Sequence, residues 1–274
     1  MTMSINTNAA AMIALQSLSA TNRQLETTQL RVTTGLKVNG PKDDASTFAI
    51  AQNMRGDIAG LGAVKTNLAL GQSITNVAID AGKAIADLLT EMKAKAVQAS
   101  QEGLDVASYN ALNNEFTSLR DQIDSIVATA EFNGTNLISS AGAVSALKVL
   151  STVDGSTISV SAGQAIDATA LAIHTAALTD ATVAFTALQA LETAIVSVSN
   201  ALASLGSAAN RLDIQADFTG KLQDILKQGV GNLVDADLAS ESANLQAFQI
   251  KQQLGVQALS IANAGPRSIM ALFR

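Results

Sequence analysis

Few residues in this chain of 274 have side chains that could carry out chemistry. The single histidine, His174, lies in a stretch rich in Ser, Thr and Ala. A protein metal site normally needs about three or four ligands, and a hydrolytic triad needs a nucleophile on a sharp turn, which nothing near His174 resembles. Cysteine is absent, which excludes disulfides and thiolate metal sites. We therefore predict no catalytic residue, no metal site and no cofactor, and interpret His174 as a surface or partly packed residue.

Three other patterns have simple structural interpretations. Asp43 and Asp44 follow Gly40-Pro41, where acidic side chains favour a helix start more readily than paired-acid catalysis. Residues 60–62 read Gly-Leu-Gly, but no strand precedes them and a third glycine is missing, so they do not form a phosphate loop. Residues 133–135 read Asn-Gly-Thr, which fits a glycosylation acceptor but also a tight turn, and we predict the turn.

The composition favours long helices over a compact globule. Hydrophobic residues make up 48% of the chain, but aromatic residues only 3%, so the core must be built from small and aliphatic side chains. The two prolines, Pro41 and Pro266, leave the chain between them free to form helix. The predicted fold class is mainly α: a long antiparallel helical hairpin or coiled coil with a small β-hairpin region in the middle.

Charge and hydropathy exclude several classes of partner. A net charge of -6 and a pI of about 4.7 argue against nucleic acid, which needs clustered Lys and Arg. The first residues have no basic region and no apolar core, so we expect no secretory signal peptide. The longest uncharged stretch of the C-terminal half, residues 193–210, is interrupted by polar residues, so we expect no membrane partner.

The two ends of the chain are predicted to be helices that pair. In the first, apolar residues at steps of three and four are interrupted by Asn22 and Gln29, and Gly40-Pro41 ends the helix. The last, from about Asp235, is apolar on two faces, so one face needs a partner outside the chain. The predicted assembly interface comprises Leu15, Leu18, Leu25, Val32, Leu245, Phe248, Ile250, Leu254, Leu259, Ile261, Leu272 and Phe273, of which Ile250, Leu254 and Ile261 form the second face.

Between the ends, helices are predicted over residues 45–101 and 106–129, and again from near Phe185 to about Lys227, followed by a glycine joint at 229 and 231. Residues 147–153 and 156–161 flank Asp154-Gly155, a hairpin signal. This organisation predicts three parts: residues 1–42 with 235–274, residues 43–138 with 188–234, and a short surface-exposed segment at 139–187.

Four stretches of the sequence resemble bacterial flagellins. They are SINTNAAAMIALQSL at residues 4–18, RVTTGLKVNGPKDDASTFAIAQNMRGDIAGL at 31–61, EFNGTNL at 131–137, and residues 235–274 down to the final arginine. The short middle is similar to that of the simple flagellins of alpha-proteobacteria. The resemblance implies a secreted structural subunit that polymerises with itself into the extracellular flagellar filament used for swimming.

The same resemblance implies how the parts would be used. The paired ends would line the inner tube of the filament, the middle helices would surround it, and residues 139–187 would face out. Partners would be other flagellins, an export chaperone, the flagellar type III export apparatus, and hook-associated and cap proteins. Glu91 and Lys95 stand where flagellins detected by the innate immune receptor carry an arginine and a leucine, which implies weak or no receptor activation.

Three alternatives remain open from the sequence. A hook-filament junction protein would have similar ends, although the short middle favours the filament subunit. A flagellin with an inserted peptidase domain would be an enzyme, but the lone His174 and the short middle argue against it. A secreted adhesin on a helical hairpin would need a large sugar-binding or basic surface, which the sequence does not show.

Overall fold

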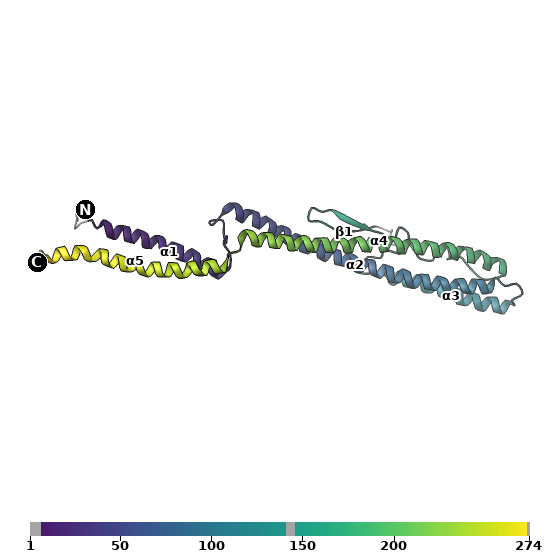
Figure 1. Cartoon of the computed structure of the whole chain (residues 1–274). Coiled ribbons are helices and arrows are strands. Elements are labelled where there is room, and N and C mark those ends of the chain that lie inside the picture. The colour runs from purple at the N-terminus through teal and green to yellow at the C-terminus, as the bar shows by residue number, and fades with distance from the viewer. Residues whose placement is uncertain (1–6, 141–145, 273–274) are drawn as a thin grey trace. The chain divides into compact units, whose positions relative to one another are not determined.

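The computed structural model describes residues 7–140 and 146–272, with side chains described up to residue 264. The chain forms two compact units: residues up to 56 with those from 225 onward, and residues 57–224. The described elements are α1 (Ala9–Thr34), α2 (Ala45–Ala99), α3 (Val106–Thr129), β1 (Leu147–Leu150), β2 (Thr157–Val160), α4 (Ala181–Val234) and α5 (Leu238–Leu272) (Figure 1). The mainly α fold with a small antiparallel sheet agrees with the predicted class.

The second unit is organised around α2 and α4, which pack antiparallel along strict seven-residue repeats. The positions of these repeats from Leu61 to Ala99 and from Ala184 to Leu212 are all buried, and about half of them hold Ala, Gly or Thr. Small side chains at a helix contact let the two backbones approach closely. The buried positions are Leu61, Val64, Leu68, Gly71, Thr75, Ala78, Gly82, Ile85, Leu89, Met92, Ala96 and Ala99 in α2, and Ala184, Ala187, Leu191, Ala194, Val198, Ala201, Leu205, Ala208 and Leu212 in α4.

Polar contacts along the α2–α4 seam fix its register. Near one end, Gln223 Nε2 donates to the carbonyl oxygen of Ile58 at 3.2 Å. Near the other, Lys93 Nζ lies 3.0 Å from Glu192 Oε1. Between them a Cβ at Gly82 would lie 2.8 Å from Leu202 Cδ2, so this glycine marks a point of close helix approach.

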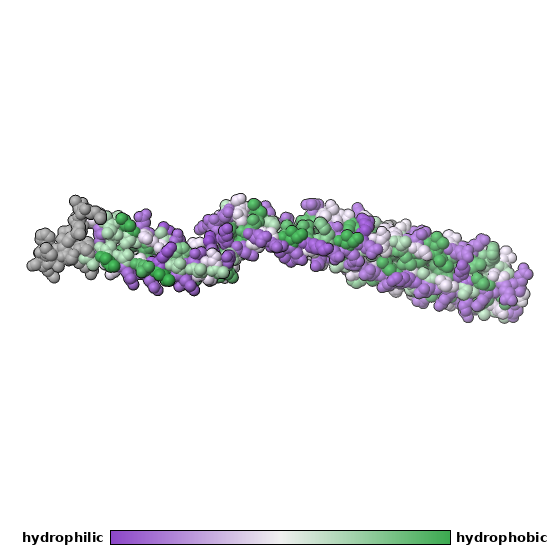
Figure 2. Space-filling view, in the orientation of Figure 1, coloured by the Kyte–Doolittle hydropathy of each residue, from purple (hydrophilic) through white to green (hydrophobic). Residues whose placement is uncertain are grey.

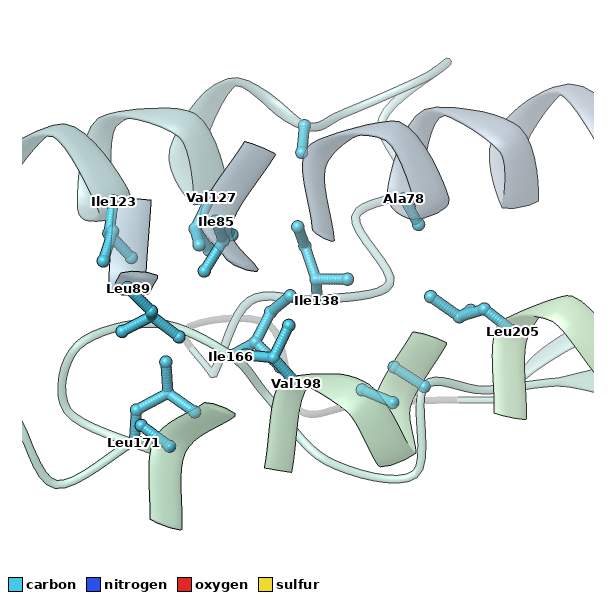
Figure 3. Packing of buried hydrophobic residues seen from close by; sticks show 14 of the residues in the cluster. Ala78, Ile85, Leu89, Ile123, Val127, Ile138, Ile166, Leu171, Val198 and Leu205 are labelled. Carbon is cyan, nitrogen blue, oxygen red and sulfur yellow. The ribbon is translucent and has the colours of Figure 1, made fainter. Parts of the chain in front are cut away.

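The core of this unit is completed by α3 and by the segment that follows it. Phe116 and Ile123 of α3 are fully buried, and Figure 3 shows Ile123 and Val127 facing Ile85 and Leu89 of α2. Ile138 and Ile166 enter the same cluster beside Val198 of α4 (Figure 3). The cluster therefore has four sources: two antiparallel helices, a shorter third helix, an irregular segment and the β-hairpin.

The β-hairpin lies on α2. Leu147 pairs with Val160 and Leu150 with Thr157 in the antiparallel register, and Gly155 in the turn has φ 90°. A Cβ at Gly71 would approach Val149 Cγ2 to 2.5 Å, so this glycine makes room for β1. Gln215 of α4 donates to the carbonyl oxygen of Ser151 at 2.8 Å. The hairpin predicted around Asp154-Gly155 is confirmed, with shorter strands than expected.

The described residues between 139 and 187 belong to the same compact unit as the helices around them. Many of their side chains are buried against the helices, among them Ile166, Ile173 and Leu178. His174 and Thr175 are exposed, and the carbonyl oxygen of His174 accepts a hydrogen bond from Arg120 Nη1 at 2.8 Å. The segment thus has a buried inner side and an exposed outer side, and its orientation in a filament stays a prediction.

Three predicted helix boundaries were wrong. The first helix ends at Gly35 (φ 72°), before Gly40-Pro41, because this left-handed C-cap lets the Gly35 amide reach the Arg31 carbonyl at 2.8 Å. The helix expected to begin near Phe185 begins at Ala181, where the Asp180 carboxylate accepts the Val183 amide at 2.9 Å. The same helix continues through the expected glycine joint to Val234, because packing outweighs a propensity cost of about 1 kcal/mol per glycine. Gly229 takes part in that packing, since a Cβ there would lie 2.8 Å from Met54 Cε.

By length and composition alone, α4 could cross a membrane, since one window has a mean hydropathy of 1.5. Of that window 28% is buried within the chain, and the repeat from Ala184 to Leu212 provides buried core positions of α4. A core helix meets the same criterion, so the hydropathy of α4 does not by itself indicate a membrane span.

Two of the aspartates that start helices by accepting backbone amides, Asp44 and Asp105, have lowered pKa values. Asp44 Oδ1 accepts the amides of Ser46 and Thr47, each at 3.0 Å, and these hydrogen bonds, above all from Thr47, lower the pKa of the Asp44 carboxyl. Asp105 accepts the Ser108 amide at 3.0 Å, and hydrogen bonds from the Ser108 side chain and then from its amide lower the pKa of the Asp105 carboxyl. Asp43 instead accepts the amides of Asn39 and Gly40 and closes the preceding turn. The predicted helix-start role therefore belongs to Asp44.

The predicted turn at Asn133-Gly134 is confirmed. Asn133 has φ 51° and Gly134 has φ 78°, so both residues are left-handed, and Phe132 and Thr135 exchange backbone hydrogen bonds of 3.1 Å. This is the turn in which Asn-Gly is preferred.

Burial of the α4 seam can be measured with two matched valines. Val198 is fully buried and Val196, two residues away on the same helix, is 59% exposed. Val198→Ala is expected to lower the free energy of unfolding by roughly 1–3 kcal/mol through lost burial and a cavity, whereas Val196→Ala should change it little. Urea unfolding followed by circular dichroism checks this. Equal losses of unfolding free energy in both variants would contradict the burial of Val198 in the seam.

The Asp105 cap predicts a specific dependence on pH. Because its pKa is lower when folded than its ordinary value of 3.8, the charged cap stabilises the fold above that value, and this contribution is lost as pH falls through the folded pKa. Asp105→Ala should therefore unfold more readily than the native chain at pH 7, and the gap should narrow below pH 3.8. Asp105→Asn keeps a neutral acceptor and serves as the control. A gap that stayed constant down to pH 2 would contradict this role.

Candidate assembly surface

The first unit is built on α1 and α5, which pack antiparallel and are joined by side-chain hydrogen bonds along their length. Asn8 Nδ2 donates to the carbonyl oxygen of Ala262 at 2.8 Å, and Gln252 Nε2 donates to Asn22 Oδ1 at 2.9 Å. At the other end, Arg31 Nη1 lies 3.0 Å from Glu241 Oε1. These contacts are spaced along α1 and fix one register, as polar residues in coiled-coil seams commonly do.

The chain segments that follow α1 and precede α5 also pair. The Lys37 amide donates to the Val234 carbonyl at 2.7 Å, and the Ala236 amide donates to the Gly35 carbonyl at 2.9 Å. Leu36 and Asp235 form an isolated antiparallel bridge at the same place. The two helices of the pair are therefore tied together at the base as well as along the seam.

The seam follows a strict heptad on both helices, and sequence reasoning identified only its large apolar members. The residues it missed are Ala11, Ala14, Thr21 and Thr28 of α1, and Glu241, Gln252, Gly255 and Ala262 of α5. Gly255 shows why small residues are needed, since a Cβ there would lie 3.1 Å from Leu18 Cδ1. The signal that could have identified these residues is their position in the seven-residue repeat, whatever their hydrophobicity.

Burial in this seam is incomplete. Among the described side chains of α1 and α5, Thr28 alone is buried, while Leu18, Leu25 and Val32 of the predicted interface are half-buried. Leu245, Phe248 and Leu259 of α5 are half-buried on the side that faces α1. Fixing a backbone costs about 1–2 kcal/mol per residue, so a pair of helices with so little buried apolar surface gains little stability from its own contacts.

Large apolar side chains remain uncovered on the open sides of the pair. Ile250 and Leu254 are each 58% exposed and Ile261 is 74% exposed, so the second face expected on α5 is open in the structure. In Figure 2 apolar residues (green) lie among polar ones (purple) on the visible face of this unit. Contiguous exposed apolar surface marks a site of interaction. The other exposed large apolar residues of the two helices are Met12, Ile13, Leu15, Leu30, Leu238 and Val256.

Leu15 does not lie in the seam, contrary to expectation. It is 56% exposed and borders a shallow surface hollow of α1 together with Met12 and Ile13. The heptad passes through Ala11, Ala14 and Leu18, which places Leu15 outside it. Leu272 lies beyond the described side chains and Phe273 beyond the described residues, so their predicted places in the interface stay predictions.

Nothing in the described ranges suggests catalysis or metal binding. No group of three His, Cys, Asp or Glu side chains there could hold a metal ion.

Comparison with known proteins identifies this arrangement. Residues 5–143 match the bacterial flagellin N-terminal helical region, and residues 188–273 match the bacterial flagellin C-terminal helical region. The chain belongs to the bacterial flagellin family. Flagellins are structural proteins, and the chain is a structural subunit of the bacterial flagellar filament, an extracellular appendage used for swimming.

Relatives of similar length place the chain among alpha-proteobacterial flagellins. It is 49% identical over 271 residues to flagellin FljK of Caulobacter vibrioides, covering 99% of this chain and 98% of the relative. It is 37% identical over 283 residues to a flagellin of Brucella melitensis, with 99% of both chains covered. The predicted resemblance to short alpha-proteobacterial flagellins is confirmed.

Two solved structures share the fold. The crystal structure of Bacillus cereus flagellin matches 56% of this chain and 88% of its own, with a TM-score of 0.51 and 27% identity. A putative flagellar hook-associated protein from Vibrio parahaemolyticus matches 70% of this chain and 100% of its own, with a TM-score of 0.56 and 17% identity. At that identity the second likeness concerns the fold alone.

Proposed function

We propose that copies of this flagellin join through the open apolar sides of the α1–α5 pair. The observation that supports this is the uncovered row on α5, Ile250, Leu254 and Ile261, opposite half-buried seam residues. A weakly buried pair that carries such a row gains stability when a neighbouring copy covers it. Polymerisation and ordering of the ends would then be one process.

We further propose that the parts of the chain occupy different layers of the filament. Residues 1–42 and 235–274 would form the inner tube, residues 43–138 and 188–234 the surrounding layer, and the outer side of 139–187 the surface. The separation of the chain ends into their own compact unit supports the first assignment. The exposed His174 and Thr175 support the last one.

We also propose secretion through the flagellar type III apparatus, with an export chaperone, hook-associated proteins and the cap as partners, and no enzymatic activity. The absence of cysteine supports a path through an oxidising exterior without thiol chemistry. The weakly buried α1–α5 pair supports export, since little stability must be overcome to unfold it. A hook-filament junction role finds no support, because full-length relatives such as FljK are named flagellins.

Polymerisation should depend on the open row of α5. Ile250→Ser with Leu254→Ser removes apolar side chains that are each 58% exposed, so it should leave the monomer folded but sharply reduce the mass of seeded polymer. Sedimentation measures the polymer, and electron microscopy identifies tubes. Gln253→Ser changes an exposed polar neighbour and should polymerise normally. Removing residues 235–274 should abolish tubes, and normal tubes from that truncation would contradict the proposal.

The positions that depart from receptor-detected flagellins are accessible in the structure. Glu91 is exposed, and Lys95 Nζ lies 2.5 Å from Glu115 Oε2 of α3, with a third of its side chain exposed. An acidic group and a paired cation in place of an arginine and an apolar contact should weaken recognition. We expect weak or no activation of the innate flagellin receptor by pure monomer in reporter cells. Glu91→Arg with Lys95→Leu should raise the response, and a strong dose-dependent response to the native chain would contradict this.

A further inference from the structure

The α1–α5 pair has a hollow of about 430 Å³ on one flank of its seam. The walls come from the stretch of α1 between Ala20 and Arg31 and from the first turns of α5. The polar groups that line it include two guanidinium groups, Arg23 and Arg31, and two amides, Gln24 and Asn244. Paired guanidinium and amide donors are the groups that proteins use to bind a carboxylate.

The cations of the hollow are incompletely compensated. Arg31 uses Nη1 to reach Glu241, but its buried Nε has no hydrogen-bond acceptor within the described chain. Arg23 donates to Ser19 Oγ at 3.1 Å and pairs with no carboxylate among the described residues. Two positive groups thus share one acidic partner, Glu241, which also lines the hollow. A second carboxylate would balance the charge and offer an acceptor to the buried donor.

The other flank of α1 carries a carboxylate without a partner. Residues 20, 24, 27 and 31 share the side of the helix that faces the hollow, and residues 22, 26, 29 and 33 share the opposite side. Glu26 is exposed there and forms no ion pair within the described chain. It is the single acidic residue of α1, as Glu241 is of α5.

We propose that this hollow receives the Glu26 carboxylate of a second copy of the chain that lies parallel beside the first. The proposal rests on the proposed polymerisation and specifies a contact within it. The hollow extends over residues 20–31, about 16 Å of helix, and Glu26 lies level with its middle. Two parallel copies side by side therefore bring Glu26 to the hollow, and a relative shift of up to about 8 Å along the axis keeps it there.

A carboxylate on one flank and its receptor on the opposite flank make a heterologous contact. Such a contact repeats in one direction from copy to copy and produces a ring or an open helical array, not a closed pair. Charged pairs of this kind fix register and orientation more than they add affinity. The apolar row on α5 would supply the association energy, and the Glu26 contact would set how neighbouring copies align.

Cross-linking tests the geometry, because the chain has no cysteine of its own. Thr27→Cys places a thiol in the wall of the hollow, and Gln29→Cys places one on the Glu26 flank. Both variants keep Glu26, Arg23 and Arg31. A short bis-maleimide added to tubes of the double variant should give a ladder of trimers and longer species on a denaturing gel. A mixture of the two single variants should give dimers only, and either single variant alone should give monomers.

Each other outcome of that experiment is decisive. Dimers from Gln29→Cys alone would mean that this flank meets itself, and monomers from tubes of the double variant would mean that the two flanks do not meet. Either result overturns the Glu26 contact and leaves polymerisation standing. Failure of the native chain to form tubes at all would overturn both.

Charge reversal tests the chemistry. Glu26→Arg and Arg23→Glu should each raise the critical concentration for polymerisation about tenfold. A mixture of the two single variants should restore it to within about threefold of the native value, because opposite charges then meet only between copies and not within one helix, where positions 23 and 26 are also neighbours. Glu131→Arg, an equal change of charge at an exposed turn of the other unit, is the control and should have little effect. If Arg23→Glu impairs polymerisation while Glu26→Arg does not, the hollow takes a different acidic group, and the proposal is wrong.

Discussion

The structure depends on the close approach of antiparallel helices through small side chains. In both units two long helices meet along a strict seven-residue repeat in which small residues, Ala, Gly and Thr, lie among larger ones. Glycine permits this close approach in both units: Gly82 packs against Leu202 in one, and Gly255 packs against Leu18 in the other. A chain with almost no aromatic residues can build extended interfaces only in this way, since close packing replaces the burial that large side chains would provide.

The two seams reach different degrees of burial because only one of them is covered. In the α2–α4 unit, α3 and the irregular segment with Ile138 and Ile166 close the sides of the helix pair, and the seam residues lose nearly all contact with solvent. No comparable element covers α1 and α5 within the described chain, so residues with the same spacing stay half-buried. The difference in burial therefore comes from the elements that cover the α2–α4 pair, and not from the seven-residue repeat. It explains how one chain can hold a unit with a covered core and a unit whose apolar surface stays open.

Sequence periodicity was sufficient to predict the helices and the two apolar faces of α5. Large aliphatic residues such as Leu254 and Leu259 show directly which faces of a helix are apolar. It did not reveal the full seams, because Thr21 or Ala14 looks the same in a seam as on a surface. The continuity of α4 through Gly229 was missed for a related reason. Local propensity disfavours glycine in a helix, and only the close approach of Met54 shows why it is accepted. The burial of Ile166 was hidden by its Ser- and Ala-rich surroundings.

The polar contacts of the α1–α5 seam follow from the same constraint. A seam filled with Leu and Ile would be stable in the isolated chain, but it would tolerate slipped registers. Asn22 with Gln252 and Arg31 with Glu241 lower the stability of the pair and at the same time specify a single alignment. If copies join as proposed, the pair can remain weak in the monomer and still present its apolar row and its charged flanks at defined levels. Stability then comes from the neighbours and alignment from the polar side chains, so that the filament does not require a strong helix pair in its subunit.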